Sequence, residues 1–260
     1  MAYAPFDLKG KVTLVTGGNS GIGLGMAEAM AQAGADVVIW GTHAGKNQAA
    51  EAKLLQHGVR VLAQVVNVAD EAAVVAGMAE AVAAMGRVDN VVANAGIGGG
   101  APSYSEMSHD LWRRVMSVNL DGVFFTTREA CKHMVERAKG GDSGGSIVVT
   151  SSLSAISGAP RNEAYASAKG AIITMIKAIA VEHARYGVRA NAILPGWIAT
   201  DMTAGAQDSE VFTTRVIGRV PFRRWGEPED FGGIAVYLAS DASKYHTGDS
   251  FIIDGGYSIF

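Results

Sequence analysis

Tyr165 and Lys169 are the two side chains whose types and spacing most clearly suggest chemistry. They stand four residues apart in "YASAK", within a stretch of helical periodicity, so both lie on one face of the expected helix. A free tyrosine has a pKa of about 10, and a lysine ammonium in a dry crevice can supply the roughly 3–4 kcal/mol that brings the phenol into use near neutral pH. The pair is a candidate general acid and base, although the same spacing is common on solvated helix faces.

A glycine-rich segment, "TGGNSGIG" from Thr16 to Gly23, directly follows the apolar run Val12–Val15. A strand that leads through such a turn into a helix aims the free N–H groups and the positive end of that helix at the bend, where an anion such as a phosphate binds. A mononucleotide P-loop would continue with Lys-Ser or Lys-Thr, but Leu24-Gly25 follows here. The glycines also depart from Gly-x-Gly-x-x-Gly, so the spacing alone leaves an ordinary strand-to-helix turn as an alternative.

The composition is that of a globular protein with a large core. The chain has 260 residues, of which 48% are hydrophobic and 18% charged, and its net charge of −3 gives no reason to expect nucleic acid or a membrane as a partner. Six scattered histidines and one cysteine, Cys131, offer no metal-ligand spacing and no internal disulfide. The N-terminal segment lacks an apolar leader and no uninterrupted apolar run could span a bilayer, so a cytoplasmic location is expected.

Short β-branched runs alternate with alanine-rich stretches of helical periodicity. The predicted strands are Val12–Thr16, Val37–Trp40, Val59–Val66, Asn90–Ala93, Ile147–Ser151, Arg189–Leu194 and Ser250–Asp254. The predicted helices are Ile22–Ala33, Lys46–Gln56, Glu71–Met85, Ser108–Lys139, Glu163–Tyr186 and Pro228–Ala239. Apolar strands separated by helices indicate a doubly wound α/β fold, in which a parallel sheet of about seven strands carries helices on both faces.

The ligand crevice of such a fold lies beyond the carboxyl ends of the strands, where the glycine-rich segment also stands. We expect residues 1–260 to form one domain. The polar, threonine-rich stretch 197–220 interrupts the alternation after a strand end and is expected to form a lid over the crevice. A surface excursion without a role is the alternative.

Further polar motifs at predicted strand ends point to one family. The sequence resembles the short-chain dehydrogenase/reductase family over essentially the whole chain, which implies a Rossmann-type sheet. The motifs that carry the resemblance are the loop Thr16–Gly23, Asn94-Ala95-Gly96, Asn119, Ser152 thirteen residues before the tyrosine, Tyr165-x-x-x-Lys169, and Pro195-Gly196-x-x-x-Thr200.

The resemblance implies a role for each of four catalytic residues. Tyr165 would transfer the proton of the carbonyl or hydroxyl group, and Ser152 would hydrogen-bond the same oxygen. Lys169 would lower the pKa of the tyrosine and hold the nicotinamide ribose, while Asn119 would position a water. The implied cofactor-binding residues are Gly17, Asn19, Ser20, Gly21, Ile22, Gly23, Thr42, Asn67, Val68, Asn94, Ala95, Gly96, Tyr165, Lys169, Pro195, Gly196, Ile198 and Thr200; no metal is implied.

The end of the second predicted strand, "VVIWGTHAGK", bears on the choice between NADP and NAD. No acidic residue stands near Gly41 to bind the ribose hydroxyls of NAD, and Thr42, His43 and Lys46 slightly favour NADP. A carboxylate introduced at position 41 is therefore expected to move the preference towards NAD by at least tenfold. Asn67 stands where many relatives carry Asp to meet the adenine amino group, and its amide oxygen can still accept that hydrogen bond.

The implied function is an NAD(P)-dependent oxidoreductase acting on a small polar alcohol or ketone of the sugar or sugar-acid type. A 3-oxoacyl-carrier-protein-type ketone reductase and a non-catalytic dinucleotide sensor are the alternatives. Four arginines near the lid could meet a substrate carboxylate, but acidic residues share the region, so a solvated face is equally expected. These arginines are Arg215, Arg219, Arg223 and Arg224. The resemblance and the apolar tail "FIIDGGYSIF" imply a homotetramer with two-fold symmetry.

Overall fold

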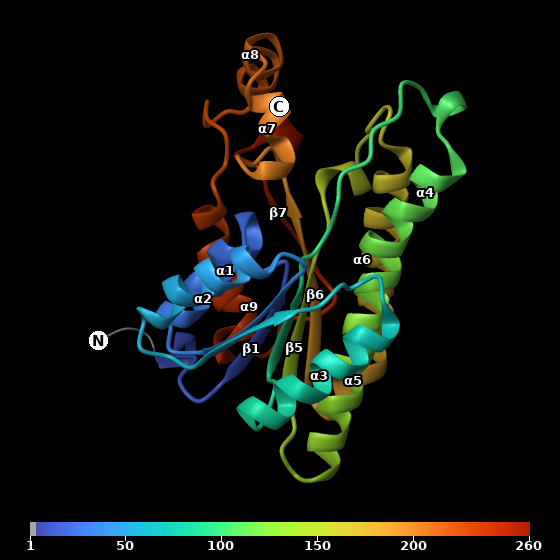
Figure 1. The fold of residues 1–260 in the computed structure, drawn as a ribbon. Helices are drawn as coiled ribbons and strands as arrows, with labels where there is room; N and C mark the ends of the chain where they lie inside the picture. Colours follow the sequence, from blue (N-terminus) through green and yellow to red (C-terminus); the bar gives the residue numbers. More distant parts are fainter. Residues whose placement is uncertain (1–3) are drawn as a thin grey trace.

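A seven-stranded parallel sheet forms the centre of the protein in the computed structural model, which describes residues 4–260 (Figure 1). The strands are β1 (Val12–Thr16), β2 (Asp36–Gly41), β3 (Val61–Val65), β4 (Asn90–Ala93), β5 (Gly145–Thr150), β6 (Val188–Pro195) and β7 (Ser250–Ile253). Their order is β3-β2-β1-β4-β5-β6-β7, and every neighbouring pair is parallel. The order reverses between β1 and β4, which is where such sheets bind their ligands.

Helices cover both faces of the sheet (Figure 1). One face carries α1 (Gly21–Gln32), α2 (Ala44–Leu55) and α9 (Gly232–Ala239), and the other carries α3 (Glu71–Met85), α4 (His109–Met116), α5 (Gly122–Lys139) and α6 (Glu163–His183). Each face has its own hydrophobic core, because successive strand residues point to opposite sides. Leu14 of β1 packs into one core with Ile172, whereas its neighbour Val15 packs into the other with Met26. The predicted doubly wound fold is confirmed.

The predicted long helix Ser108–Lys139 is interrupted, and this prediction is wrong in its middle. α4 ends at Met116, a π-helical turn covers Ser117–Asp121, and α5 begins at Gly122. A π turn keeps the chain helical and changes only the hydrogen-bond partner, so apolar periodicity does not reveal it. The turn contains Asn119. The end of the predicted helix Pro228–Ala239 is correct, but its first turn, Pro228–Phe231, is a 3₁₀ helix.

One helical stretch within residues 4–260, Glu163–Tyr186, is long and apolar enough to cross a membrane by length and composition alone. The stretch comprises α6 and a 3₁₀ turn, Ala184–Tyr186. In the fold its Ile172 and Ile176 are buried in the core beneath β6. This apolar character is what a helix packed along a sheet requires.

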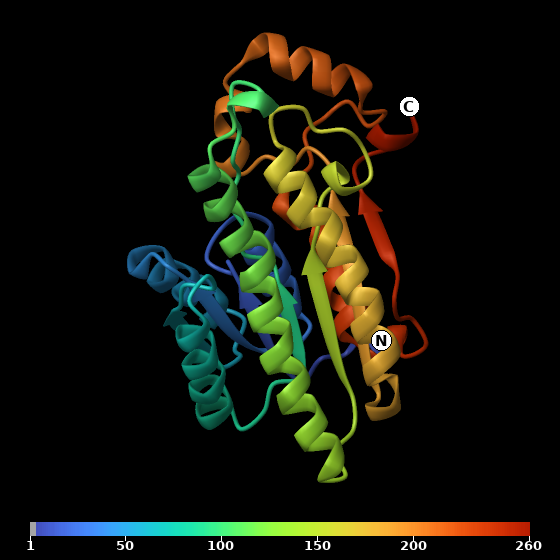
Figure 2. The ribbon, with the colours of Figure 1, turned by 90° about the vertical axis from the view of Figure 1, so that its right-hand side faces the viewer.

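The segment after β6 rises beyond the carboxyl ends of the strands (Figure 2). It consists of a 3₁₀ turn, Asp201–Thr203, followed by α7 (Ala204–Gln207) and α8 (Glu210–Arg219). Trp197 at its base packs edge-on against Phe212 of α8, with ring centroids 5.1 Å apart, and against Tyr257 of the C-terminal tail at 6.5 Å. The segment and the tail therefore form one layer above the sheet.

His133 gives the fold a defined pH dependence. The Val88 N–H donates to Nε2 of this α5 residue at 3.1 Å, which requires an unprotonated ring nitrogen. Burial, together with Arg137, lowers the pKa of His133 below its ordinary value near 6.5. Between the two pKa values the unfolded chain binds more protons, so the His133 contribution to stability is complete above pH 6.5 and is lost as the pH falls.

We expect His133→Gln, whose amide oxygen can still accept from Val88, to lose less stability than the wild type between pH 7 and pH 5. The difference should be at most about 1–3 kcal/mol, the cost of a buried donor without a partner. Urea unfolding at both pH values measures it. Parallel declines in the two proteins would show that His133 does not carry this effect.

Candidate active site

The glycine-rich loop between β1 and α1 packs so closely against its surroundings that side chains do not fit at its glycines. Gly17 and Gly21 have φ of +63° and +51°, in the left-handed region that favours glycine. A Cβ on Gly23 would lie 2.2 Å from the Gly17 carbonyl oxygen, and one on Gly21 would lie 3.2 Å from Thr200 Cγ2. Ser20 occupies the N-cap of α1 without using its side chain as a cap, and Ile22 packs partly into the core. The N-terminus of α1 thus opens into a cradle of backbone N–H groups suited to a pyrophosphate.

Asn94 ties this loop to the strands on either side. Its Nδ2 donates to the carbonyl oxygens of Thr16, at 3.1 Å, and Gly17, at 3.4 Å, while its Oδ1 accepts from the Thr150 hydroxyl at 3.1 Å. The backbone N–H groups of Asn94 and Ala95 donate to Thr16 Oγ1. The side chain expected beside the adenosine ribose is therefore occupied in holding the ends of β1, β4 and β5 together.

Ser152, Tyr165 and Lys169 come together at the carboxyl end of β5. Ser152 stands two residues after the end of β5 and caps a 3₁₀ turn, its Oγ accepting from the Ser154 N–H at 3.1 Å. The Ser152 hydroxyl is within hydrogen-bond reach of Tyr165. Nζ of Lys169 lies 5.5 Å from the centroid of the tyrosine ring and donates to the Thr150 carbonyl oxygen at 2.6 Å. Thr150 is a contributor that the sequence motifs did not single out.

Burial controls the protonation of this pair. It lowers the pKa of Lys169, 3% exposed, to about 8, and it raises the pKa of Tyr165, which the Ser152 hydrogen bond opposes. The sequence predicted that Lys169 would lower the pKa of Tyr165. In the structure the pKa of Tyr165 is raised instead, because burial has the largest effect and the lysine ammonium donates to the Thr150 carbonyl.

Asn119 lies fully buried in the π-helical turn, beside the same lysine. Its carboxamide accepts from the Ile97 N–H and donates to the Ile97 carbonyl, both at 2.8 Å. A Cβ on Gly96 would stand 3.0 Å from Asn119 Oδ1 and 3.5 Å from Lys169 Nζ. Asn119 thus fixes the loop after β4, and Gly96 leaves the approach to the lysine open.

The predicted residues after β6 connect the sheet to the segment above it. The Gly196 N–H donates to Ile253 O of the neighbouring strand, immediately after Pro195. Ile198 is 5% exposed and forms an isolated parallel bridge with Gly226. Thr200 caps the next 3₁₀ turn and sits directly over Gly21 of the glycine-rich loop.

The remaining predicted residues follow β2 and β3, where the adenosine was expected. Thr42 is exposed between β2 and α2, and Val68 is buried against Gly122 of α5. Asn67 is exposed and its Oδ1 accepts from the Ala69 N–H at 3.1 Å, so the oxygen proposed to meet adenine already has one donor.

Two contacts on the adenosine side were not predicted from the sequence. Lys46 of α2 forms an ion pair with Asp201, Nζ to Oδ2 2.7 Å, which crosses from α2 to the segment after β6. Asn47 is buried and accepts from Asn19 Nδ2 at 2.7 Å. Neither contact has a signal in the sequence, because the partners lie 155 and 28 residues apart.

Position 41 does not have the room that the sequence suggested. A Cβ on Gly41 would lie 2.1 Å from Asn19 Nδ2 and 2.4 Å from Asn47 Oδ1. A single Gly41→Asp exchange therefore forces these carboxamides apart before its charge can act. This exchange alone is therefore not expected to give the tenfold move towards NAD that the sequence suggested.

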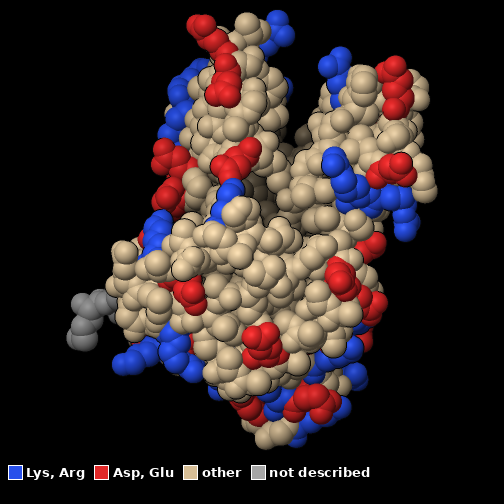
Figure 3. Space-filling view, viewed as in Figure 1, with Lys and Arg blue, Asp and Glu red and all other residues tan. Residues whose placement is uncertain are grey.

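A deep cleft opens above the sheet, between the segment after β6 and the α4 side (Figure 3). The glycine-rich cradle and the Tyr165–Lys169 pair both belong to the carboxyl edge of the sheet that faces this opening. A Cβ at Gly23 would overlap the Gly17 carbonyl and the Asn94 side chain, so glycine at this position lets α1 begin directly against the loop, with its free N–H groups available to a pyrophosphate. Within residues 4–260, no group of three or more His, Cys, Asp or Glu side chains is arranged to hold a metal ion.

This arrangement defines a dinucleotide-binding protein with a Ser-Tyr-Lys centre, and comparison with known proteins agrees. A family model described as enoyl-(acyl carrier protein) reductase matches residues 17–258. The chain belongs to the short-chain dehydrogenase/reductase family.

Three similar proteins illustrate the range of that family. The chain is 39% identical to 2-dehydro-3-deoxy-D-gluconate 5-dehydrogenase of Pseudoalteromonas atlantica, covering 97% of each chain. It is 40% identical to the NADP-dependent (R)-specific alcohol dehydrogenase of Lentilactobacillus kefiri, covering 96% of this chain and 98% of that one. The crystal structure of a gluconate 5-dehydrogenase from Burkholderia cenocepacia, in complex with NADP and tartrate, superposes with a TM-score of 0.92 at 34% identity, covering 98% of each chain.

Proposed function

We propose that the protein is an NAD(P)-dependent oxidoreductase that interconverts a hydroxyl and a carbonyl group on a small polar substrate of the sugar or sugar-acid type. The observation that carries this proposal is the meeting of Ser152, Tyr165 and Lys169 at the sheet edge that also holds the glycine-rich cradle. An idle dinucleotide sensor would not need a buried lysine beside a half-buried tyrosine, because burying an ammonium costs free energy.

The chain's own residues supply the proton chemistry and the orientation of the substrate. Tyr165 gives its proton to the carbonyl oxygen in reduction and takes it back in oxidation, and Ser152 donates a hydrogen bond to that oxygen. Lys169 holds positive charge beside the phenol, while Asn119 keeps the loop after β4 in place. A nicotinamide dinucleotide, when bound, supplies or accepts the hydride.

The cofactor is NADP or NAD, and we favour NADP. The glycine-rich loop with Ser20 and Ile22 would hold the pyrophosphate, Asn19 would lie beside the adenosine ribose, and Ile198 with Thr200 would meet the carboxamide end. No carboxylate stands at Gly41 to repel a 2′-phosphate, whereas the Lys46 ammonium lies on the first turn of α2. One similar structure holds NADP, and one similar enzyme is named for it.

Two of the three relatives described above are named as dehydrogenases of sugar acids, and none of the three is named as an acyl-carrier-protein reductase. Their names support a sugar acid as the substrate. Most of the arginines near the lid already have partners. Arg219 donates to the Tyr257 hydroxyl, Arg224 pairs with Asp230 at 2.7 Å, and Arg223 donates to the Gly218 carbonyl. Arg215, exposed on α8, is the arginine that these contacts leave for a substrate carboxylate.

The segment 197–220 serves as the substrate lid in this proposal, and residues 1–260 work as one dinucleotide-binding and catalytic domain. Support for the lid comes from its place above the cleft (Figure 3) and from the contacts at its base, where Trp197 packs against Phe212 and Ile198 bridges Gly226. A cytoplasmic location follows from the use of a nicotinamide dinucleotide and agrees with the single buried cysteine, Cys131.

A substrate screen with both cofactors tests the function. Purified protein is supplied with D-gluconate, 2-dehydro-3-deoxy-D-gluconate, a simple secondary alcohol and a 3-oxoacyl thioester, and absorbance of the reduced nicotinamide is followed. We expect turnover of a sugar acid with the highest kcat/KM. Turnover of the thioester alone would favour the reductase alternative, and dinucleotide binding without any turnover would favour the sensor.

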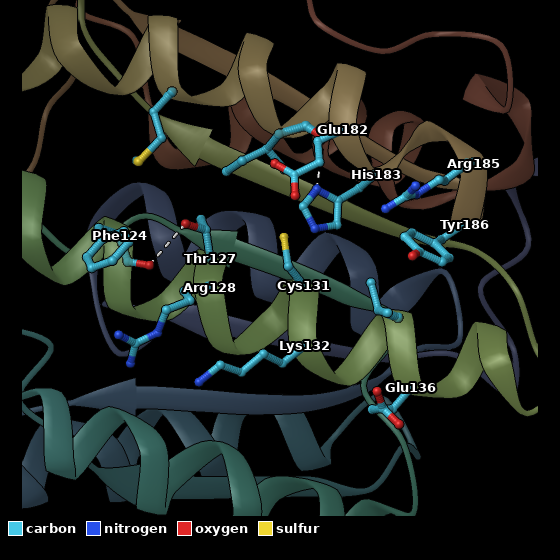
Figure 4. Close-up of a pocket in the computed structure, with 13 residues that line it drawn as sticks. Phe124, Thr127, Arg128, Cys131, Lys132, Glu136, Glu182, His183, Arg185 and Tyr186 are labelled. Carbon is cyan, nitrogen blue, oxygen red and sulfur yellow. Dashed lines mark hydrogen bonds between the residues drawn. The ribbon is translucent and has the colours of Figure 1, made fainter.

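Self-association into a tetramer with two-fold symmetry completes the proposal, because such a tetramer needs two self-complementary surfaces. One candidate surface is the groove between α5 and α6 (Figure 4), where Phe124, Cys131 and Ile179 are flanked by Arg128 and Glu182. Burial raises the pKa of the Cys131 thiol to about 12, so this cysteine is an apolar lining residue and not a nucleophile.

The other candidate surface lies beside the edge strand β7. Phe222 is 73% exposed, Ile259 89% and Phe260 69%. Exposed aromatic and branched side chains gathered at a sheet edge are typical of an interface.

We expect sedimentation at micromolar concentration to give four times the chain mass of 27.0 kDa. Phe124→Asp and Phe260→Asp should each give dimers, because each removes one surface and leaves the other. Tyr245→Asp, at a fully exposed position outside both surfaces, is the control. A monomeric wild type would refute the assembly.

A further inference from the structure

Asn47 is a buried polar residue on the first turn of α2 that joins three segments at the adenosine end of the site. It is 3% exposed. Its Nδ2 donates to the carbonyl oxygens of Gly41, at 3.0 Å, and Gln64, at 2.9 Å, which belong to β2 and β3. Its Oδ1 accepts from Asn19 Nδ2 of the glycine-rich loop at 2.7 Å. The two hydrogen bonds that Asn47 donates hold its side chain in place, and Asn47 in turn holds the Asn19 side chain.

The two carboxamides fill the space above Gly41. A Cβ there would approach Asn19 Nδ2 to 2.1 Å and Asn47 Oδ1 to 2.4 Å, far inside normal contact distances. Gly41 is thus glycine because of these neighbours, since its φ is not in the left-handed region. Asn19 is only half-buried and held by one bond, whereas Asn47 is held by three, so Asn47 is the fixed member of the pair.

The end of β2 is where dinucleotide-binding folds recognise the adenosine ribose, commonly with an acidic side chain. Here the Asn19–Asn47 pair puts an uncharged carboxamide at that place. Asn19 Nδ2 carries two N–H groups, and the one not given to Asn47 makes no hydrogen bond within residues 4–260. A free N–H donates more strongly to an anionic oxygen than to a neutral hydroxyl.

We propose that the Asn19–Asn47 pair determines the cofactor preference, with Asn19 as the donor towards the ribose 2′-substituent and Asn47 as the positioning residue that holds it there. The inference rests on the proposed dinucleotide-dependent function. It implies that Asn47 acts through Asn19 and that position 41 cannot take a carboxylate while both carboxamides are present.

Binding of NADPH and NADH tests the pair without any substrate. Fluorescence titration gives Kd for each in the wild type, Asn19→Ala, Asn47→Ala and the double variant, with Gln48→Ala as an exposed amide control on the same helix. We expect Asn19→Ala to reduce the preference for NADPH by about three- to tenfold, the range that separates a charge-assisted from a neutral hydrogen bond. Asn47→Ala should give the same reduction, and the double variant should give no more than either.

A second comparison uses Gly41→Asp. In the wild-type background we expect it to weaken binding of both dinucleotides and to change their ratio by less than about threefold. In the Asn19→Ala/Asn47→Ala background, where both obstructing groups are gone, the same exchange should turn the ratio towards NADH by at least tenfold. Melting temperatures identify variants that fail to fold. If the Asn47 variants fail to fold, Asn19→Ala alone still tests the proposal.

Three outcomes would overturn the inference. The first is that the effects of Asn19→Ala and Asn47→Ala on the NADPH/NADH preference multiply in the double variant. The second is that Asn19→Ala leaves this preference unchanged. The third is that Gly41→Asp alone increases the preference for NADH tenfold and keeps the affinity for NADH. A wild type that binds neither dinucleotide would instead contradict the proposed function itself.

Discussion

Tyr165→Phe loses at least about 100-fold in kcat and keeps its dinucleotide Kd within about threefold of the wild type. The exchange removes only the hydroxyl that carries the transferred proton, and general acid–base catalysis contributes about 10²–10⁴-fold. The aromatic ring stays beside Lys169 and the surrounding packing is unchanged, so the folded site survives. Steady-state kinetics with the preferred substrate measure the loss, and fluorescence titration measures the dinucleotide affinity.

Tyr245→Phe is the matched control, since that hydroxyl is fully exposed on the surface. It should leave both quantities unchanged. Near-normal turnover by a folded Tyr165→Phe protein would remove the tyrosine from the reaction and with it the main support for an oxidoreductase.

Lys169→Met also loses at least about 100-fold in kcat/KM, but it differs from the tyrosine variant in two respects. Dinucleotide affinity falls, because the ammonium is proposed to hold the nicotinamide ribose. The activity of the wild type is expected to change with an apparent pKa near 8, the value for the buried lysine, and this step is absent from the pH profile of Lys169→Met. Kinetics between pH 6 and pH 10 and a dinucleotide titration check both.

The stability of Lys169→Met should stay close to that of the wild type. Lowering the lysine pKa from 10.5 to about 8 corresponds to about 3 kcal/mol of unfavourable burial at neutral pH, which methionine avoids. Loss of the bond to Thr150 O leaves a buried carbonyl without a partner, at about 1–3 kcal/mol in the other direction. Lys177→Met, exposed on the same helix, is the control. An unchanged affinity and pH profile in Lys169→Met would exclude the double role.

The sequence predicted those elements best in which local signals and tertiary packing agree. α3 has the predicted bounds, Glu71–Met85, because Asp70 caps its start through the Ala73 N–H and Gly86 ends it in the left-handed conformation. β1 and β4 also have the predicted bounds. Motif spacing likewise predicted that Ser152, Tyr165 and Lys169 would share one strand edge, since they follow a buried strand and open a long helix.

Features that depend on side-chain contacts between distant segments could not be predicted from the sequence. Asn47 resembles any polar residue of an exposed helical turn, and only the fold shows that β2, β3 and the glycine-rich loop converge on it. The same convergence removes the space at Gly41. The tyrosine pKa is a further example, because its direction depends on burial and on which oxygen the lysine faces.

The hydrogen bonds of Asn94 have a consequence for how this enzyme can be altered. The Gly17 carbonyl accepts from Asn94, Asn94 accepts from Thr150, and the carbonyl of the same threonine accepts from Lys169. The glycine-rich loop and the Tyr165–Lys169 pair are therefore neighbours in one continuous network, and substitutions within such a network do not add. Directed evolution of this enzyme has to leave that network intact and find new specificity at its margins, in the lid and at the beginning of α2.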